Sequence, residues 1–158
     1  MPWITDSFSE TVVEAKKLIW QEFEIHADAI VLLCTQKEMI DRVILELSTR
    51  KIPKQRLNNL IQFILPLLVG KYFKETNEIW LIEGKGDNFS TLIHELLHSI
   101  QVCSPHREGL VDFLTYKITG DQTIIDPFLL KEWKELEMMH GLEAIKKRLL
   151  IPSDCEDF

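Results

Sequence analysis

The chain has 158 residues, of which 46% are hydrophobic and 27% charged, and its formal net charge is −7 at pH 7. This length and composition are typical of one globular domain, and they exclude a disordered chain, a collagen-like repeat and a small disulfide-stabilised protein. An acidic domain is also a poor candidate for binding the phosphate backbone of a nucleic acid.

The first half of the chain predicts helices on either side of one buried strand. Apolar residues at helical spacing predict a helix over residues 9–25, and a branched apolar run predicts a strand over residues 29–34. Helical spacing returns over residues 38–47. A mostly apolar helix then follows over residues 54–69, and we expect it to kink near Pro66.

A hairpin opens the second half. Its strands are predicted at Tyr72-Phe73 and at residues 79–82, and the following turn supplies the cap of a helix over residues 89–102. Ser104-Pro105 predicts the start of another helix, which runs to about residue 118.

The C-terminal third continues in the same way. The helix that starts at Ser104-Pro105 is expected to end near Gly120, and Asp126-Pro127 repeats the pattern of a capping residue followed by proline. A long helix follows, which Gly141 could interrupt. We therefore predict an α+β fold with helices packed on a small mixed sheet of about three strands, a single domain over residues 1–151 and an acidic tail over residues 152–158.

Cysteine content and hydropathy indicate the compartment. Cys34, Cys103 and Cys155 are too few and too scattered for a disulfide framework. Residues 1–6 do not resemble a signal peptide, and the longest apolar stretch, residues 60–69, is far shorter than a membrane-spanning helix. We expect a cytoplasmic protein that neither crosses a membrane nor binds nucleic acid.

The segment His94-Glu95-Leu96-Leu97-His98 carries the most chemical information, because it is an HExxH pattern inside a predicted helix. Residues four apart lie on the same helix face, so both imidazoles can reach one zinc ion. Glu95 can then take a proton from a zinc-bound water. The alternative is a chance match on an amphipathic helix.

The next predicted helix offers a third ligand. Glu108 and Asp112 are four residues apart and share a face, so Glu108 could complete a site of two histidines and one glutamate. Asp112 could accept the second ring N–H of a ligand histidine and fix its tautomer. His106 is the competing candidate for the third ligand. The composition of the site predicts one Zn²⁺ per chain.

His94 to His98 followed by Glu108-x-x-x-Asp112 resembles the signature of the gluzincin metallopeptidases, and the small size resembles the soluble minigluzincins. The resemblance implies a zincin-like fold with an active-site helix and a glutamate helix. It also implies that residues 79–82 form the exposed edge strand along which such enzymes bind an extended peptide.

The expected function is therefore a zinc-dependent metallopeptidase that hydrolyses a peptide or protein substrate, with Glu95 activating a zinc-bound water. Tyr116 and His140 are candidate donors to the oxyanion of the tetrahedral intermediate. Two alternatives stay open: a zinc-binding regulatory or structural protein without useful turnover, and a helical binding module. We also hypothesise that the C-terminal segment, with Cys155, can occupy the cleft and keep the enzyme latent.

Overall fold

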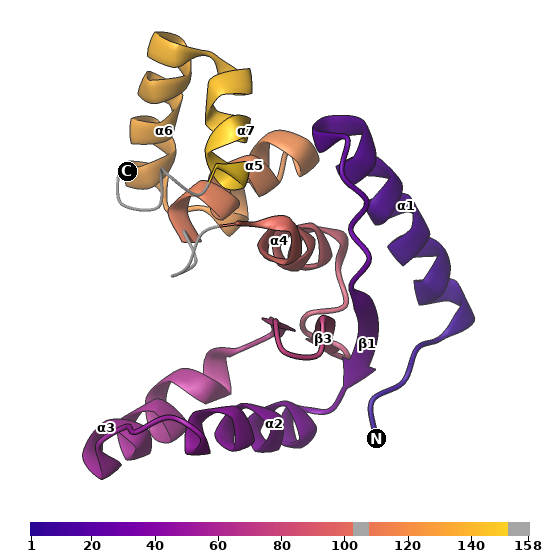
Figure 1. Ribbon diagram of the computed structural model, residues 1–158, viewed down its shortest axis with the longest axis vertical. Coiled ribbons are helices and arrows are strands. Elements are labelled where there is room, and N and C mark those ends of the chain that lie inside the picture. The colour runs from indigo at the N-terminus through magenta and orange to yellow at the C-terminus, as the bar shows by residue number, and fades with distance from the viewer. Residues whose placement is uncertain (103–107, 152–158) are drawn as a thin grey trace.

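The computed structural model describes residues 1–102 and 108–151, and it confirms the α+β class (Figure 1). The predicted helix start at Ser104-Pro105, the candidate ligand His106 and the acidic tail with its proposed role in latency lie outside the described residues. Over the described residues, seven α-helices pack with a mixed sheet of three strands. These elements are α1 (Asp6–Phe23), β1 (Ile30–Cys34), α2 (Gln36–Ser48), α3 (Lys54–Asn59), β2 (Gly70–Phe73), β3 (Glu78–Ile82), α4 (Phe89–Ile100), α5 (Glu108–Thr119), α6 (Pro127–His140) and α7 (Leu142–Leu150).

The strand order is β1-β3-β2, with β3 parallel to β1 and antiparallel to β2. The prediction that residues 79–82 form an exposed edge is therefore wrong. These residues belong to β3, which is paired on both sides, because β1 joins it from far away in the sequence. The edge strand next to β3 in the hairpin is β2. The outer side of β1 is partly covered by an isolated bridge between Trp3 and Leu33.

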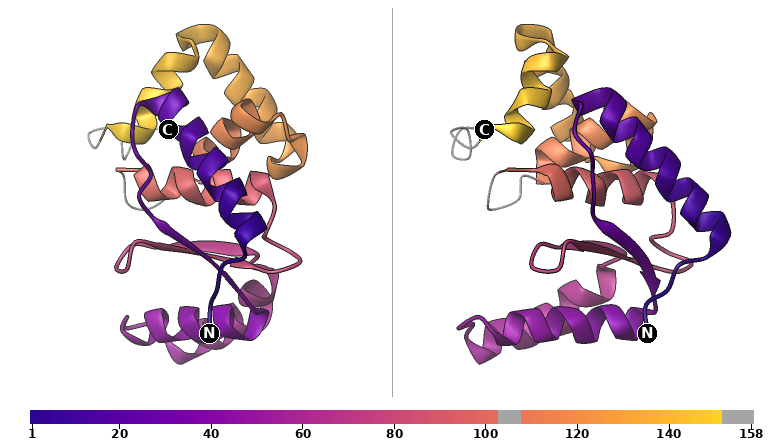
Figure 2. Two further views of the ribbon diagram at one scale, coloured as in Figure 1. Left: turned by 90° about the vertical axis from the view of Figure 1, so that its right-hand side faces the viewer. Right: turned by 45° about the vertical axis from the view of Figure 1, so that its right-hand side comes forward.

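The sheet separates two hydrophobic cores, and helices cover both of its faces (Figures 1 and 2). Residues Val31, Leu33, Ile79 and Leu81 point to the larger core, which is shared with α1, α4 and the three C-terminal helices. The opposite face, with Ile82, packs on α2 and the segment before β2. This alternation along each strand leaves α4 directly above the sheet, between it and α5.

Local sequence fixes where α4 begins and which way it faces. As predicted, the turn before the helix supplies the cap, since the Asn88 side chain accepts a hydrogen bond of 2.8 Å from the Thr91 N–H. The apolar face is fully buried, and it consists of Leu92, Ile93, Leu96 and Leu97. Burial of this face sets the rotation of the helix and leaves the HExxH side chains beside the cavity described below.

The helix predicted over residues 54–69 is the largest local difference. The α-helical part ends at Asn59, and the chain continues as a π-helical turn (Leu60–Ile64) and a 3₁₀ turn (Leu65–Leu67). Pro66 lies in the 3₁₀ turn, where its missing N–H cannot continue an α-helix, so the break extends one turn further back than expected.

The other boundaries agree more closely with the sequence. The first helix begins at Asp6, three residues earlier than predicted, because the Thr5 side chain provides the cap. Gly141, with φ of 82°, separates α6 from α7, and this confirms the predicted interruption.

None of the helices over residues 1–102 and 108–151 has the length and apolar character needed to cross a membrane.

Candidate metal centre

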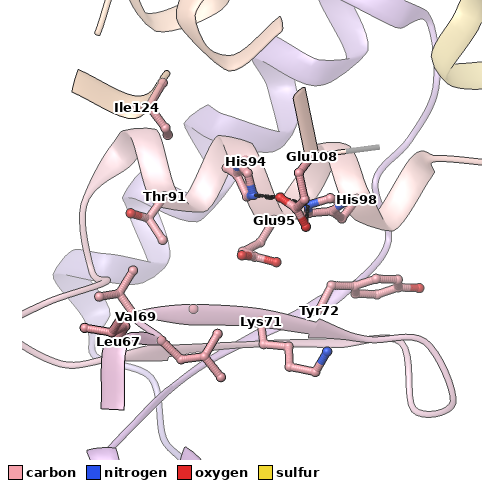
Figure 3. Close-up of a pocket in the computed structure, with 12 residues that line it drawn as sticks. Leu67, Val69, Lys71, Tyr72, Thr91, His94, Glu95, His98, Glu108 and Ile124 are labelled. Carbon is pink, nitrogen blue, oxygen red and sulfur yellow. Dashed lines mark hydrogen bonds and ion pairs between the residues drawn. The ribbon is translucent and has the colours of Figure 1, made fainter. Parts of the chain in front are cut away.

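Three side chains from two helices converge on one point. His94 and His98 lie one turn apart on α4, and Glu108 is the first residue of α5. The two Nε2 atoms are 3.1 Å apart, and Glu108 Oε2 lies 3.2 Å from each of them (Figure 3). Together these three residues form a possible metal site.

The triangle of donor atoms has the size that zinc requires. Tetrahedral ligands at 2.0–2.1 Å from a zinc ion are about 3.3 Å from one another, close to the three spacings seen here. Two imidazoles and one carboxylate are also the ligand set of several catalytic zinc centres, in which a fourth position stays open to water. The residues present therefore fit a zinc ion.

The charges of the three groups already complement one another. Contacts with His94 and His98 hold the pKa of the Glu108 carboxyl far below its usual range. Burial alone would lower the pKa of His94, but its contacts with Asp112 and Glu108 outweigh this and raise the pKa to about 10. An imidazole binds a metal only when the coordinating nitrogen is deprotonated, so occupation of this site requires the loss of that proton.

Each histidine has an outer partner on its second ring nitrogen. Asp112 Oδ1 lies 3.1 Å from His94 Nδ1, one turn along α5 from Glu108, although the contact is not aligned as a hydrogen bond. Gln101 Oε1 lies 3.0 Å from His98 Nδ1. When these oxygens accept an Nδ1–H, the Nε2 lone pairs are left for the metal. The structure thus places Asp112 beside the outer ring nitrogen of His94.

The contribution of Gln101 was missed by the sequence analysis. It is the residue that follows the last turn of α4, three positions after His98. The available signal was this i, i+3 spacing, since an amide side chain one turn from a ligand histidine can reach its outer nitrogen.

A cavity of about 410 Å³ opens beside the three ligand atoms, between α4 and the edge strand β2 (Figure 3). Glu95 lines this cavity and is only 8% exposed. Burial raises the pKa of its carboxyl, and this effect exceeds the opposite effect of the two histidines. A carboxyl group with a raised pKa is a better proton acceptor than an ordinary surface glutamate.

The hydrogen-bond register opens the backbone of β2 toward the cavity. Val69 O accepts a hydrogen bond of 2.8 Å from Ile82 N, and Lys71 pairs with Trp80 two residues later. Because bonded and non-bonded pairs alternate in an antiparallel ladder, the N–H and C=O groups of Gly70 and Tyr72 point away from β3. These two residues line the cavity.

Neither candidate oxyanion donor is brought to this cavity. Tyr116 packs between Phe113 and Lys134, at the contact of α5 with α6. His140 is an exposed residue at the C-terminal end of α6. Helical spacing alone could not reveal this, because the direction of both side chains depends on how α5 and α6 pack.

Asp112→Asn should lower zinc affinity about 10- to 100-fold, the usual cost of losing an outer partner of a ligand histidine. The amide keeps the size of the side chain but loses the negative charge that favours an Nδ1–H on His94. Isothermal titration calorimetry with Zn²⁺ measures the effect. Asp41→Asn, at an exposed position on α2, is the matched control and should bind zinc like the wild type. Unchanged affinity in Asp112→Asn would make Asp112 an ordinary surface acid.

Comparison of the chain with protein-family profiles, with curated proteins and with solved structures finds no match.

Proposed function

We propose that this protein is a zinc-dependent metallopeptidase of the gluzincin type. The proposal is carried by one observation: the donor atoms of His94, His98 and Glu108 converge beside the buried Glu95, above the open edge of a sheet. A structural zinc site would need metal ligands such as His94, His98 and Glu108. It would have no use for a buried proton acceptor such as Glu95. The combination of ligands and an adjacent proton acceptor supports hydrolysis.

Each residue has a distinct role in this proposal. His94, His98 and Glu108 would hold the zinc ion, with Asp112 and Gln101 keeping the two imidazoles in the correct tautomer. A zinc ion bound there supplies a Lewis acid that polarises a carbonyl group and acidifies water. Glu95 accepts a proton from the attacking water and returns it to the nitrogen of the leaving amine.

The substrate would be an extended peptide paired with β2. Gly70 and Tyr72 offer two N–H and two C=O groups to such a segment, so it would become the fourth strand of the sheet. Antiparallel pairing is slightly more stable than parallel pairing. In that orientation, the peptide residues that follow the cleaved bond lie toward the N-terminal end of β2. We therefore expect β2, rather than residues 79–82, to bind the extended peptide.

One end of the cavity is apolar. Leu67, Leu68, Val69 and Ile124 line it beyond Thr91, whereas Tyr72 lies at the opposite end (Figure 3). Leu67 is 77% exposed, so its side chain is available for contact with a bound ligand. Covering these side chains with an apolar group removes them from water and stabilises the complex. We therefore propose that the substrate carries a large apolar residue on this side of the cleaved bond.

A hydrolysis assay tests the proposed function and its preference together. Zinc-loaded protein should cleave a peptide with leucine after the cleaved bond with a kcat/KM about 10- to 100-fold above that of the alanine analogue, and chelation should stop both reactions. Leu67→Glu should abolish most of this preference. Leu45→Glu is the matched control, since Leu45 is also exposed but lies on α2 outside the cavity lining. An equal loss of preference in both variants would remove Leu67 from the binding site.

A second function is favoured by the positions of Tyr116 and His140, because neither lines the cavity. If no other residue donates a hydrogen bond to the oxyanion, turnover would be slow, and the protein would act as a zinc-binding regulatory or structural protein. Zinc binding by a protein that cleaves no peptide under any condition would favour this function.

A further inference from the structure

Gly70, the first residue of β2, is buried beneath α4. Its backbone does not require glycine, since the glycines with positive φ are Gly84, Gly120 and Gly141. A glycine inside a strand weakens it and often marks a place where another group approaches closely. The reason for glycine at this position must therefore be the space around it.

The space above Gly70 is closed on three sides. A Cβ atom at residue 70 would lie 2.8 Å from Leu81 Cδ2, 3.1 Å from Thr91 Cγ2 and 3.4 Å from Glu95 Cγ. Leu81 is fully buried in the core and Thr91 is stiff because it branches at Cβ. Since neither can move freely, an added side chain would push through Thr91 on α4, the helix that carries Glu95, while its direct contact with Glu95 would be an ordinary one.

Gly70 faces both the proposed peptide-binding edge and Glu95. Its N–H and C=O point to the open edge of β2, where the peptide would pair, while its Cα faces the stem of the general base. We propose, building on the proposed peptidase function, that Gly70 is a positioning residue. The missing side chain lets the edge strand lie directly against α4, and this holds the Glu95 carboxylate between the bound peptide and the metal ligands.

Gly70→Ala tests this role, because one methyl group fills the space without changing charge. The variant should keep its zinc, with an affinity within about threefold of the wild type, since none of the three atoms nearest to the added methyl group belongs to a ligand residue. Its kcat for the leucine peptide should fall about 10- to 100-fold, as expected for a misplaced catalytic group. KM should change little, because the backbone groups that pair with the peptide remain.

Gly109→Ala is the matched control. Gly109 follows Glu108 in α5, but among the described residues a Cβ there would meet only Trp133 Nε1, at 3.4 Å, an ordinary contact. This variant should have the kcat of the wild type. If Gly70→Ala does not fold, the double variant Gly70→Ala/Leu81→Val relieves the closest contact while the tight contact with Thr91 on α4 stays, and it should show the same loss of kcat.

Crystal structures of the wild type and Gly70→Ala provide a readout that does not depend on turnover. The Glu95 carboxylate should be displaced by more than about 0.5 Å, the tolerance of a productive catalytic geometry. A folded Gly70→Ala variant with wild-type kcat, or with Glu95 in its original place, would overturn the role of Gly70. If the wild type itself cleaves no peptide, the proposed function fails, and the displacement of Glu95 still decides the role of Gly70.

Discussion

Glu95→Gln should lower the kcat of peptide hydrolysis by about 10²- to 10⁴-fold, the range of a lost general acid–base group. The amide has nearly the same shape as the carboxylate, so the buried position beside β2 stays filled. It cannot accept a proton from water, however, and cannot return one to the leaving amine. The proton-transfer role is therefore removed without disturbing the fold.

Zinc content separates this explanation from a general loss of the site. Glu95 is not among the three residues whose donor atoms converge, so Glu95→Gln should bind zinc at the wild-type level. Glu83→Gln, at an exposed position in the turn after β3, is the control and should keep full activity. Hydrolysis at the wild-type rate by Glu95→Gln would show that this glutamate is not the proton acceptor.

Replacing either ligand histidine should have the second large effect. In His94→Ala and His98→Ala we expect zinc content to fall from about one ion per chain to less than about 0.1, because a two-ligand site cannot hold zinc in competition with water. Elemental analysis after gel filtration measures this. His140→Ala, which removes an exposed histidine from the end of α6, should keep its zinc. Full occupancy in both ligand variants would mean that the metal binds elsewhere.

The third ligand can be identified by the same method. Glu108→Ala should weaken zinc binding more than about 100-fold, beyond the cost of losing an outer partner, while His106→Ala should not. The reverse result would indicate a site of three histidines and would remove the gluzincin resemblance.

Much of the possible metal site could be predicted because its information is local. The spacing of His94 and His98 fixes their common helix face, and the apolar residues between them orient that face. Glu108 and Asp112 share a face for the same reason. Spacing alone does not predict that these two side chains meet the histidines, since this depends on how α5 packs against α4.

The order of the strands could not be predicted from local pattern. Residues 79–82 form an apolar run that suits an edge or a central position equally well. Their central position results from parallel pairing with β1, whose Ile30 lies opposite Glu78 although the two are 48 positions apart in the sequence. Gly70 carried no sequence signal either, because its importance depends on side chains from β3 and α4 that meet only in the folded chain.

We propose that this chain binds a catalytic zinc ion, and the zinc content of the purified wild-type protein decides this claim. Elemental analysis should find about one zinc per chain, which a chelator removes and added Zn²⁺ restores, as expected for two histidines and one glutamate with an open fourth position. The metal-free protein should show one binding event in calorimetry, absent in His98→Ala. Purified protein without zinc, together with no heat of binding when Zn²⁺ is added, would contradict the claim.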